Sequence, residues 1–450
     1  MQTRGKRFTV LGAGRSGLAS VKLLLKKRAK VFLSDSAPKK KHAATIRQLE
    51  QLTVDHEFGA NTHRALDADM IVVSPGVPSD APILLLAREK NIPIIGEIEL
   101  ASEFAAHPIV AITGTNGKTT TTSLTGEIFK QAGWNTVVAG NIGTAFADVT
   151  DQDLGERGIY ILEVSSFQLD TIKSFRPKVS AILNITPDHL DRYKNYEAYI
   201  QSKFHIADNQ RGHDILVFNH DDEVVRSFAD TLSFRTLGFS LKTELKNGAY
   251  LENDMVILAV GREREALMPK SEIGIPGPHN LMNAMASALM AKAMGVSIES
   301  IRKTLRSFKG VEHRIEFVRE LNGVKFYNDS KATNVDALYY ALQSFQEPII
   351  LIAGGKDKGN DYSAVRDLVE KHVKAIVAVG DGAGKVKSYF EKMKPVLEAG
   401  HSMEKAVNLA RGKAEKGDIV LLSPACASFD MFDNYEHRGI VFKDLVNAEN

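Results

Sequence analysis

The stretch Thr113-Gly114-Thr115-Asn116-Gly117-Lys118-Thr119-Thr120 decides the fold of this chain. An apolar run at 109–113 precedes it and a helical pattern follows it, which predicts a turn between a strand and a helix. Backbone N–H groups in such a turn can surround phosphate oxygens, and the positive end of the helix adds to the attraction. Lys118 would reach the β- and γ-phosphates, and Thr119 would offer its hydroxyl to Mg²⁺. The stretch therefore predicts a nucleotide site, although Ile112 occupies the place of the standard motif's first glycine.

Two more glycine-rich turns between a strand and a helix lie near residues 12 and 354. Apolar β-branched runs alternate with helical patterns along most of the chain, which favours parallel sheets covered by helices. Short alternating segments between about 233 and 275 predict antiparallel strands added to the central unit. A hairpin is predicted over 314–328, with Asn322-Gly323 at its turn. We expect an α/β protein of three domains, which agrees with 450 residues at about 150 residues per domain.

Composition and charge exclude several classes of protein. The chain has 57 Lys and Arg against 55 Asp and Glu, so its net charge of +2 lacks the basic excess typical of nucleic-acid binding. The single cysteine, Cys426, fits a reducing cytosol, and we expect it to be a buried packing residue rather than a nucleophile. No apolar run approaches about 18 residues, and the N-terminus lacks an apolar signal core. We expect a cytoplasmic enzyme that binds no nucleic acid and does not insert into a membrane.

The first glycine-rich turn, Gly12-Ala13-Gly14-Arg15-Ser16-Gly17, matches the fingerprint of dinucleotide-binding proteins. Asp35 ends the next predicted strand, where a ribose-binding acid is expected, so an NAD-dependent oxidoreductase is an alternative. This unit ends near residue 100, about half the length of a full dinucleotide domain. The turn can equally hold the diphosphate of another nucleotide. The segment Ser74-Pro75-Gly76 would lie at the same edge of the sheet, where ligands bind.

Polar residues in the central unit suggest a metal site beside the phosphate loop. Glu163 ends the strand predicted over 158–164 and can hold Mg²⁺ directly or through water. His189 could coordinate a metal, orient a phosphate or serve a structural role. Asn141 could donate to a phosphate or close a turn, and Lys203 on the next helix could be an ordinary surface lysine.

Together these residues resemble the Mur ligase family, the ATP-dependent enzymes that add amino acids in peptidoglycan synthesis. The matching residues follow in the family's order: Gly114–Thr119, Glu163, Asp188-His189, Lys203, His279–Asn283 and His313-Arg314. The resemblance covers essentially the whole chain and implies three domains. A Rossmann-like UDP-binding domain would span 1–97, and a Rossmann-like amino-acid-binding domain would span 311–450. Between them, 98–310 would form a P-loop ATPase domain with a mostly parallel sheet and a small antiparallel one.

Two segments, 328–334 and 423–430, are similar to those of the family's D-glutamate-adding branch. The resemblance implies that ATP activates UDP-N-acetylmuramoyl-L-alanine as an acyl phosphate, which the amine of D-glutamate then attacks. A monomer is expected. The alternatives are a related Mur-type or folate-type ligase for another amino acid, and a nucleotide-binding protein without catalytic activity.

The resemblance also implies roles for single residues. The UDP substrate would be bound by Gly14, Arg15, Ser16, Asp35, Ser74, Gly76, Asn141 and His189. ATP would be bound by Gly114, Thr115, Asn116, Gly117, Lys118, Thr119, Thr120, Asn283, Arg314 and Asp329. D-Glutamate would be bound by Lys331, Thr333, Ser428, Phe429, Tyr435 and Lys358, with Lys356 as the alternative to Lys358. Two Mg²⁺ ions would be held by Thr119, Glu163, His189 and Lys203, the last as a carbamate formed with CO₂. The catalytic residues would be Lys118, Glu163, His189 and Lys203.

Overall fold

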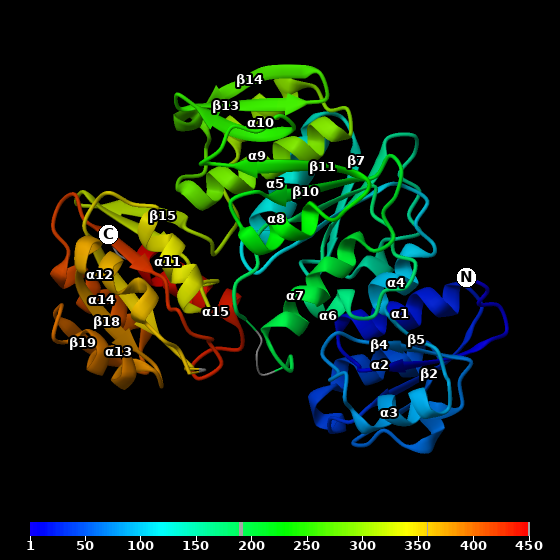
Figure 1. Cartoon of the computed structure of the whole chain (residues 1–450). Coiled ribbons are helices and arrows are strands. Elements are labelled where there is room, and N and C mark those ends of the chain that lie inside the picture. The colour runs from blue at the N-terminus through cyan, green and yellow to red at the C-terminus, as the bar shows by residue number, and fades with distance from the viewer. Residues whose placement is uncertain (189–191, 358, 449–450) are drawn as a thin grey trace. The chain divides into compact units, whose positions relative to one another are not determined.

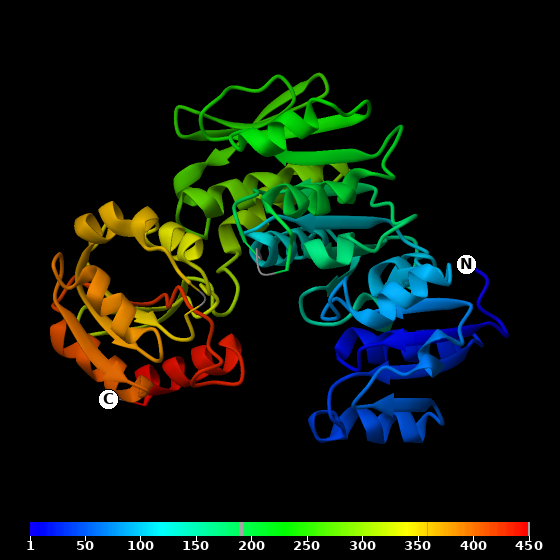
Figure 2. The same ribbon diagram turned by 60° about the horizontal axis from the view of Figure 1, so that its bottom comes forward.

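The computed structural model describes residues 1–188, 192–357 and 359–448, and it divides into two compact units. The first comprises Met1–Ser271 with Met282–Leu305, and the second comprises Glu272–Leu281 with Arg306–Asn450. Two sheets lie in the first unit and one in the second, each with helices packed against it (Figures 1 and 2). Two predicted site residues, His189 and Lys358, lie outside the described residues. No helix in the described part of the chain is long and apolar enough to cross a bilayer.

The first sheet is parallel and has the order β3-β2-β1-β4-β5. Its strands are β1 (Arg7–Leu11), β2 (Lys30–Asp35), β3 (Asp55–Phe58), β4 (Met70–Val73) and β5 (Ile94–Gly96). Its helices are α1 (Arg15–Lys26), α2 (Ala43–Gln51), α3 (Pro82–Glu89) and α4 (Glu97–Ser102). Because β1 pairs with β2 on one side and β4 on the other, the strand order reverses at β1. Ligands of open α/β sheets bind at the carboxyl edge beside such a reversal.

The central sheet has the order β14-β13-β12-β11-β10-β9-β6-β8-β7. Its parallel strands are β6 (Ile109–Thr113), β7 (Asn135–Gly140), β8 (Gly158–Glu163), β9 (Val179–Ile182), β10 (Ile215–Asn219) and β11 (Arg235–Ser240). The predicted antiparallel strands are confirmed as β12 (Gly248–Glu252), β13 (Met255–Val260) and β14 (Glu263–Pro269). They continue the same sheet, because β12 pairs with β11. Every residue of β6 and β8 is buried, as expected for inner strands covered on both faces.

The helices along this part of the chain include the two that contribute to the phosphate site. They are α5 (Lys118–Gln131), α6 (Ser166–Leu169), α7 (Tyr196–Phe204), α8 (Glu223–Ala229), α9 (Pro278–Ala293) and α10 (Ile298–Ser307). The strand order reverses again at β6, between β8 and β9, so the turn that joins β6 to α5 lies where a ligand is expected.

The sheet of the second unit has the order β15-β16-β20-β17-β18-β19. Its strands are β15 (Glu316–Leu321), β16 (Val324–Asn328), β17 (Ile349–Gly354), β18 (Val373–Val379), β19 (Val396–Gly400) and β20 (Ile419–Leu422). The predicted hairpin is confirmed, with positive φ at both turn residues, +52° at Asn322 and +79° at Gly323. Ile349 and Leu351 pack into one core and Ile350 and Ile352 into another, so helices cover both faces.

Five helices belong to the second unit: α11 (Val335–Gln343), α12 (Arg366–His372), α13 (Ala383–Phe390), α14 (Met403–Lys413) and α15 (Tyr435–Asn447). The predicted α/β class and the arrangement in three domains are confirmed, with one sheet for each domain. The limits 1–97, 98–310 and 311–450 stay a prediction.

Candidate active site

The predicted phosphate loop joins β6 to α5 and is shaped by contacts within the first unit. Gly117 has φ of +84°, and a Cβ atom there would stand 2.5 Å from Asn283 Oδ1. Both requirements favour glycine. The Asn184 carbonyl oxygen accepts from the Thr115 N–H at 2.9 Å, and Asn184 Oδ1 accepts from the Asn116 N–H at 2.8 Å. These contacts within the protein fix the shape of the loop.

Lys118 folds back over this loop. Its Nζ donates to the carbonyl oxygens of Gly114 at 2.8 Å and Thr115 at 2.7 Å. The Gly114 carbonyl oxygen also accepts from Lys203 Nζ at 2.9 Å. Two lysine side chains that are far apart in the sequence thus share one acceptor, and two like charges so close together disfavour each other.

Lys203 lies on α7 and only 2% of the residue is exposed. Burial, followed by the charge of Lys118, holds the pKa of Lys203 well below its ordinary value, and nearby carboxylates oppose this shift. Its Nζ lies 4.6 Å from the centre of the Tyr199 ring. This environment favours the neutral amine, the nucleophilic form of a lysine. The interpretation of Lys203 as a surface lysine is wrong.

Glu163 ends β8 beside the first turn of α5. Its Oε2 accepts from the Thr119 hydroxyl at 2.8 Å, and its Oε1 accepts from Asn141 Nδ2 at 2.9 Å. The Asn141 N–H donates to the Glu163 carbonyl oxygen at 2.8 Å, and a Cβ at Gly140 would stand 2.3 Å from the same oxygen. A buried carboxylate next to a hydroxyl presents the hard oxygen ligands that Mg²⁺ prefers, so these residues fit the predicted metal.

A pocket of about 640 Å³ lies at the carboxyl edge of the first sheet, beside the reversal at β1. The described residues predicted to bind the UDP substrate all line it: Gly14, Arg15, Ser16, Asp35, Ser74, Gly76 and Asn141. Asp35 shapes the turn, because its carboxylate accepts from the N–H groups of Ala13 at 2.6 Å and Ala37 at 2.7 Å. Arg15 donates to the Gly143 carbonyl oxygen, which links the first sheet to the loop after β7. The volume is in the range of sites for small molecules and cofactors.

In the second unit, Asp329 follows β16 and accepts from the Ser423 hydroxyl at 2.8 Å. Burial raises the pKa of Asp329 to about 7, although hydrogen bonds and the charge of Arg314 oppose the shift. Arg314 Nε is buried and, within the described residues, has no hydrogen-bond partner. Burial and the charge of Arg314 lower the pKa of His279 to about 4, so His279 adds no positive charge at neutral pH. A partly buried guanidinium whose buried Nε is an unused donor fits an anion such as a phosphate.

The described residues predicted to surround D-glutamate follow β16 and β20, except Lys356, which follows β17. Ser428 is buried, whereas Phe429 is 65% exposed. Lys331 Nζ lies 5.0 Å from the centre of the Tyr435 ring, a distance at which cation and ring attract each other. Thr333 is partly buried just before α11.

Arg438 holds these two segments together, and sequence reasoning missed it. This buried side chain donates to Ser330 Oγ at 2.9 Å, to the Ser330 carbonyl oxygen at 2.6 Å and to the Cys426 carbonyl oxygen at 3.0 Å. Burial lowers the pKa of Arg438 to about 10, which keeps it charged at neutral pH. No sequence signal marks it, because an arginine on a helix usually faces solvent.

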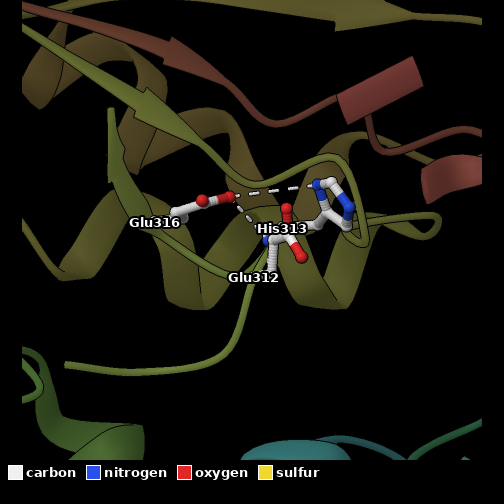
Figure 3. A group of neighbouring side chains, drawn as sticks. All are labelled: Glu312, His313 and Glu316. Atoms are coloured by element: carbon white, nitrogen blue, oxygen red, sulfur yellow. Dashed lines mark hydrogen bonds and ion pairs between the residues drawn. The ribbon is translucent and has the colours of Figure 1, made fainter. Parts of the chain in front are cut away.

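The segment around Arg314 contains a cluster of two carboxylates and one histidine (Figure 3). Glu316 accepts from the His313 N–H at 2.9 Å, and His313 Nδ1 lies 2.9 Å from Asn328 Nδ2. The ligand atoms of Glu312, His313 and Glu316 lie within 4.8 Å of one another. However, Lys443 Nζ donates to both Glu312 and Glu316. The ammonium group takes the role of the cation, so the cluster is an ion-pair network that fixes this segment.

Cys426 is buried, as predicted, with 1% of the residue exposed. Asn360 Nδ2 lies 3.2 Å from its Sγ, and burial raises the pKa of the thiol. The protonated thiol is a poor nucleophile, which agrees with a packing role.

Two further residues support the phosphate loop but carried no clear signal. Tyr199 is buried, and its hydroxyl lies 3.0 Å from Thr115 Oγ1, yet a tyrosine on a helix is usually a core residue. Asn184 follows β9, so its position at a carboxyl edge could have identified it. Asn283 accepts from the Thr121 hydroxyl at 3.1 Å, and its role with adenine stays a prediction.

Comparisons with known proteins agree along the whole chain. Three family models match: the Mur ligase MurD-like N-terminal domain at 6–96, the Mur ligase middle domain at 112–291 and the Mur ligase glutamate ligase domain at 313–426. The chain is 45% identical over 454 residues to the UDP-N-acetylmuramoylalanine--D-glutamate ligase of Koribacter versatilis, covering 99% of this chain and 98% of that protein. It is 46% identical to the enzyme of the same name from Thermoanaerobacter sp. strain X514, with 99% of each chain covered.

Solved structures show the same fold at low sequence identity. A pseudomurein peptide ligase type C from Methanothermus fervidus has a TM-score of 0.61 and 19% identity, covering 99% of this chain and 100% of that one. The UDP-N-acetylmuramate-alanine ligase of Thermotoga maritima has a TM-score of 0.60 and 19% identity, with the same coverage. These likenesses support the fold and leave specificity to the site residues.

Proposed function

Because this chain belongs to the Mur ligase family, we propose that it joins D-glutamate to UDP-N-acetylmuramoyl-L-alanine at the expense of ATP. Relatives that are 45% identical over nearly the whole chain carry the name of that ligase. The observation that carries the proposal is the glycine-rich loop between β6 and α5, where Lys118 folds over the loop and Thr119 donates to the strand-end carboxylate of Glu163. Such an arrangement can hold nucleotide phosphates with Mg²⁺.

The chemistry explains why ATP is needed. A carboxylate is a poor acyl donor because it would have to expel oxide. A carboxylate oxygen of the L-alanyl group attacks the γ-phosphorus of ATP, and ADP leaves. The amine of D-glutamate then attacks the acyl carbon, loses a proton and displaces inorganic phosphate through a tetrahedral intermediate. Lys118 and Arg314 would neutralise the negative charge of the reacting phosphates.

We assign the metal ligands to Thr119 and Glu163, with His189 and a carbamate on Lys203 completing two Mg²⁺ sites. Bound Mg²⁺ supplies the charge needed to bring a polyphosphate and a carboxylate together. The buried Lys203 amine supports the carbamate: Nζ attacks the carbon of CO₂ and loses a proton, leaving a negative group. The negative carbamate would attract the Lys118 ammonium, whereas a protonated Lys203 would be repelled by it.

The pocket at the first sheet would hold the UDP part of the substrate, with Asn141 toward the sugar. Lys331, Thr333, Ser428, Phe429, Tyr435 and either Lys358 or Lys356 would bind D-glutamate. We propose that the enzyme acts in the cytoplasm as a monomer.

The decisive experiment measures phosphate release from ATP with UDP-N-acetylmuramoyl-L-alanine and a panel of amino acids. Release should require D-glutamate, because its amine consumes the acyl phosphate. Release that ignores D-glutamate or prefers another amino acid would reject the specificity and favour a related ligase. Calorimetric titrations with UDP and with NAD test the oxidoreductase alternative. We expect UDP to bind and NAD not to bind.

Two variants test the catalytic cluster. Lys118→Ala should reduce turnover by orders of magnitude. Lys130→Ala is the matched control, because Lys130 is an exposed lysine at the far end of the same helix. Lys203→Ala should lose activity and regain part of it with added short-chain carboxylates, which would replace the carbamate. Full activity of Lys118→Ala, or no recovery of Lys203→Ala, would contradict these roles.

A further inference from the structure

Three consecutive lysines, Lys39–Lys41, form a short 3₁₀ turn at the rim of the pocket in the first sheet. Ala37, two positions before the turn, and His42, directly after it, both line that pocket. All three lysines are exposed. Within the part of the chain that the structure describes, none of them forms an ion pair. Neither packing nor an internal charge partner therefore explains three adjacent like charges, which repel one another.

The charged residues inside the pocket already have partners. Arg15 donates to the Gly143 carbonyl oxygen, and His42 Nε2 lies 3.7 Å from Asp35 Oδ2. The Asp35 carboxylate also accepts from the backbone N–H groups of Ala13, in the glycine-rich turn, and Ala37. The lysine turn thus adds three positive charges at the entrance of a pocket whose own ionisable side chains, Arg15, Asp35 and His42, already contact protein groups.

We propose that Lys39–Lys41 attract the anionic nucleotide end of the substrate and speed its entry into this pocket without contacting it when bound. The inference rests on the proposed function, in which a diphosphate enters here. Charges that line an entrance raise the local concentration and association rate of an oppositely charged ligand by about 10- to 1000-fold at low salt. The screening length is about 30 Å at 0.01 M salt and about 3 Å at 1 M. An attraction that acts at a distance must therefore disappear at high salt.

The test compares the wild type with K39E/K40E/K41E in calorimetric titrations with UDP and with uridine, each at about 0.01 M and 1 M salt. A matched control is R4E/K6E/K30E, which reverses three exposed charges in the same domain. Lys6 and Lys30 lie at the amino ends of β1 and β2, joined by a backbone hydrogen bond of 2.8 Å. The pocket lies at the carboxyl ends, about 16 Å along the strands.

We expect the lysine-turn variant to bind UDP about tenfold or more weakly at low salt and equally at high salt. Uridine, which has no charge, should bind all three proteins alike. At low salt the control should weaken UDP binding less than the lysine-turn variant does, because its charges lie farther from the pocket, and at 1 M salt it should match the wild type. In the complete reaction the variant should show a higher KM for the UDP substrate at low salt and an unchanged kcat.

Equal UDP affinity of wild type and lysine-turn variant at low salt would overturn the inference and leave the proposed function standing. A loss that persists at 1 M salt, or that extends to uridine, would also overturn it, because it indicates direct contact. If the wild type itself binds no UDP, the proposed function fails instead.

Discussion

Replacing Glu97 by glutamine tests how burial acts on a carboxylate between the first two sheets. Glu97 is the first residue of α4, and only 1% of it is exposed. Its Oε1 accepts from the Ala147 N–H at 2.6 Å. Its Oε2 is buried and has no hydrogen-bond partner among the described residues. Glutamine keeps the shape and the acceptor while removing the charge.

The expected difference in the free energy of unfolding follows from the pKa of Glu97, which burial raises from 4.5 to about 7. Below about pH 4.5 the carboxyl is protonated in both the folded and the unfolded chain. Between about 4.5 and 7 only the unfolded chain loses the proton, so the free energy of unfolding falls as the pH rises. Above about 7 the loss is complete, and at about 1.4 kcal/mol per pH unit it amounts to roughly 3 kcal/mol. Glu97→Gln should escape this loss.

Urea unfolding of both proteins between pH 4.5 and 8.5 measures the difference. The two free energies of unfolding should be similar at the acid end, and the variant should be more stable by up to about 3 kcal/mol at the alkaline end. Other titrating groups affect both proteins equally and cancel in the comparison. Parallel curves, or a variant less stable at pH 8.5, would show that Glu97 is not held protonated by burial.

Three more predictions concern other positions. Gly117→Ala should weaken ATP binding in calorimetry and lower the free energy of unfolding in urea by about 1–3 kcal/mol, because the new Cβ would meet Asn283. The control is Gly261→Ala, at φ +71° with open space around it, which should bind ATP normally. Asp329→Asn should stabilise the protein above pH 7 by up to about 4 kcal/mol, since the pKa of Asp329 is about 7 in the folded protein and ordinarily 3.8. The same variant should release phosphate from ATP more slowly. Cys426 should react with iodoacetamide only after unfolding, and rapid labelling of the native protein in mass spectrometry would refute its burial.

Sequence patterns predicted inner strands well and element ends less well. The sequence predicts strands at the apolar runs 109–113 and 419–422, and both have those bounds in the structure, because each run is buried. For 97–106 the sequence predicts a short connecting helix, whereas α4 ends at Ser102. Its end depends on contacts with segments far along the chain, such as the hydrogen bonds of Glu99 with the N–H groups of residues 173–175. Local sequence does not contain that information.

The sequence by itself determined which chemistry is available: a glycine-rich turn with Lys118 and Thr119, and a carboxylate at the end of a strand. These signals are local, because a turn's conformation depends on its own residues. Only the tertiary structure decided that Lys203 shares the Gly114 carbonyl oxygen with Lys118 and lies buried on α7. Lys203 and Gly114 are 89 positions apart in the chain. A side chain's pKa depends on its distance from water and from other charges, and folding alone creates those distances.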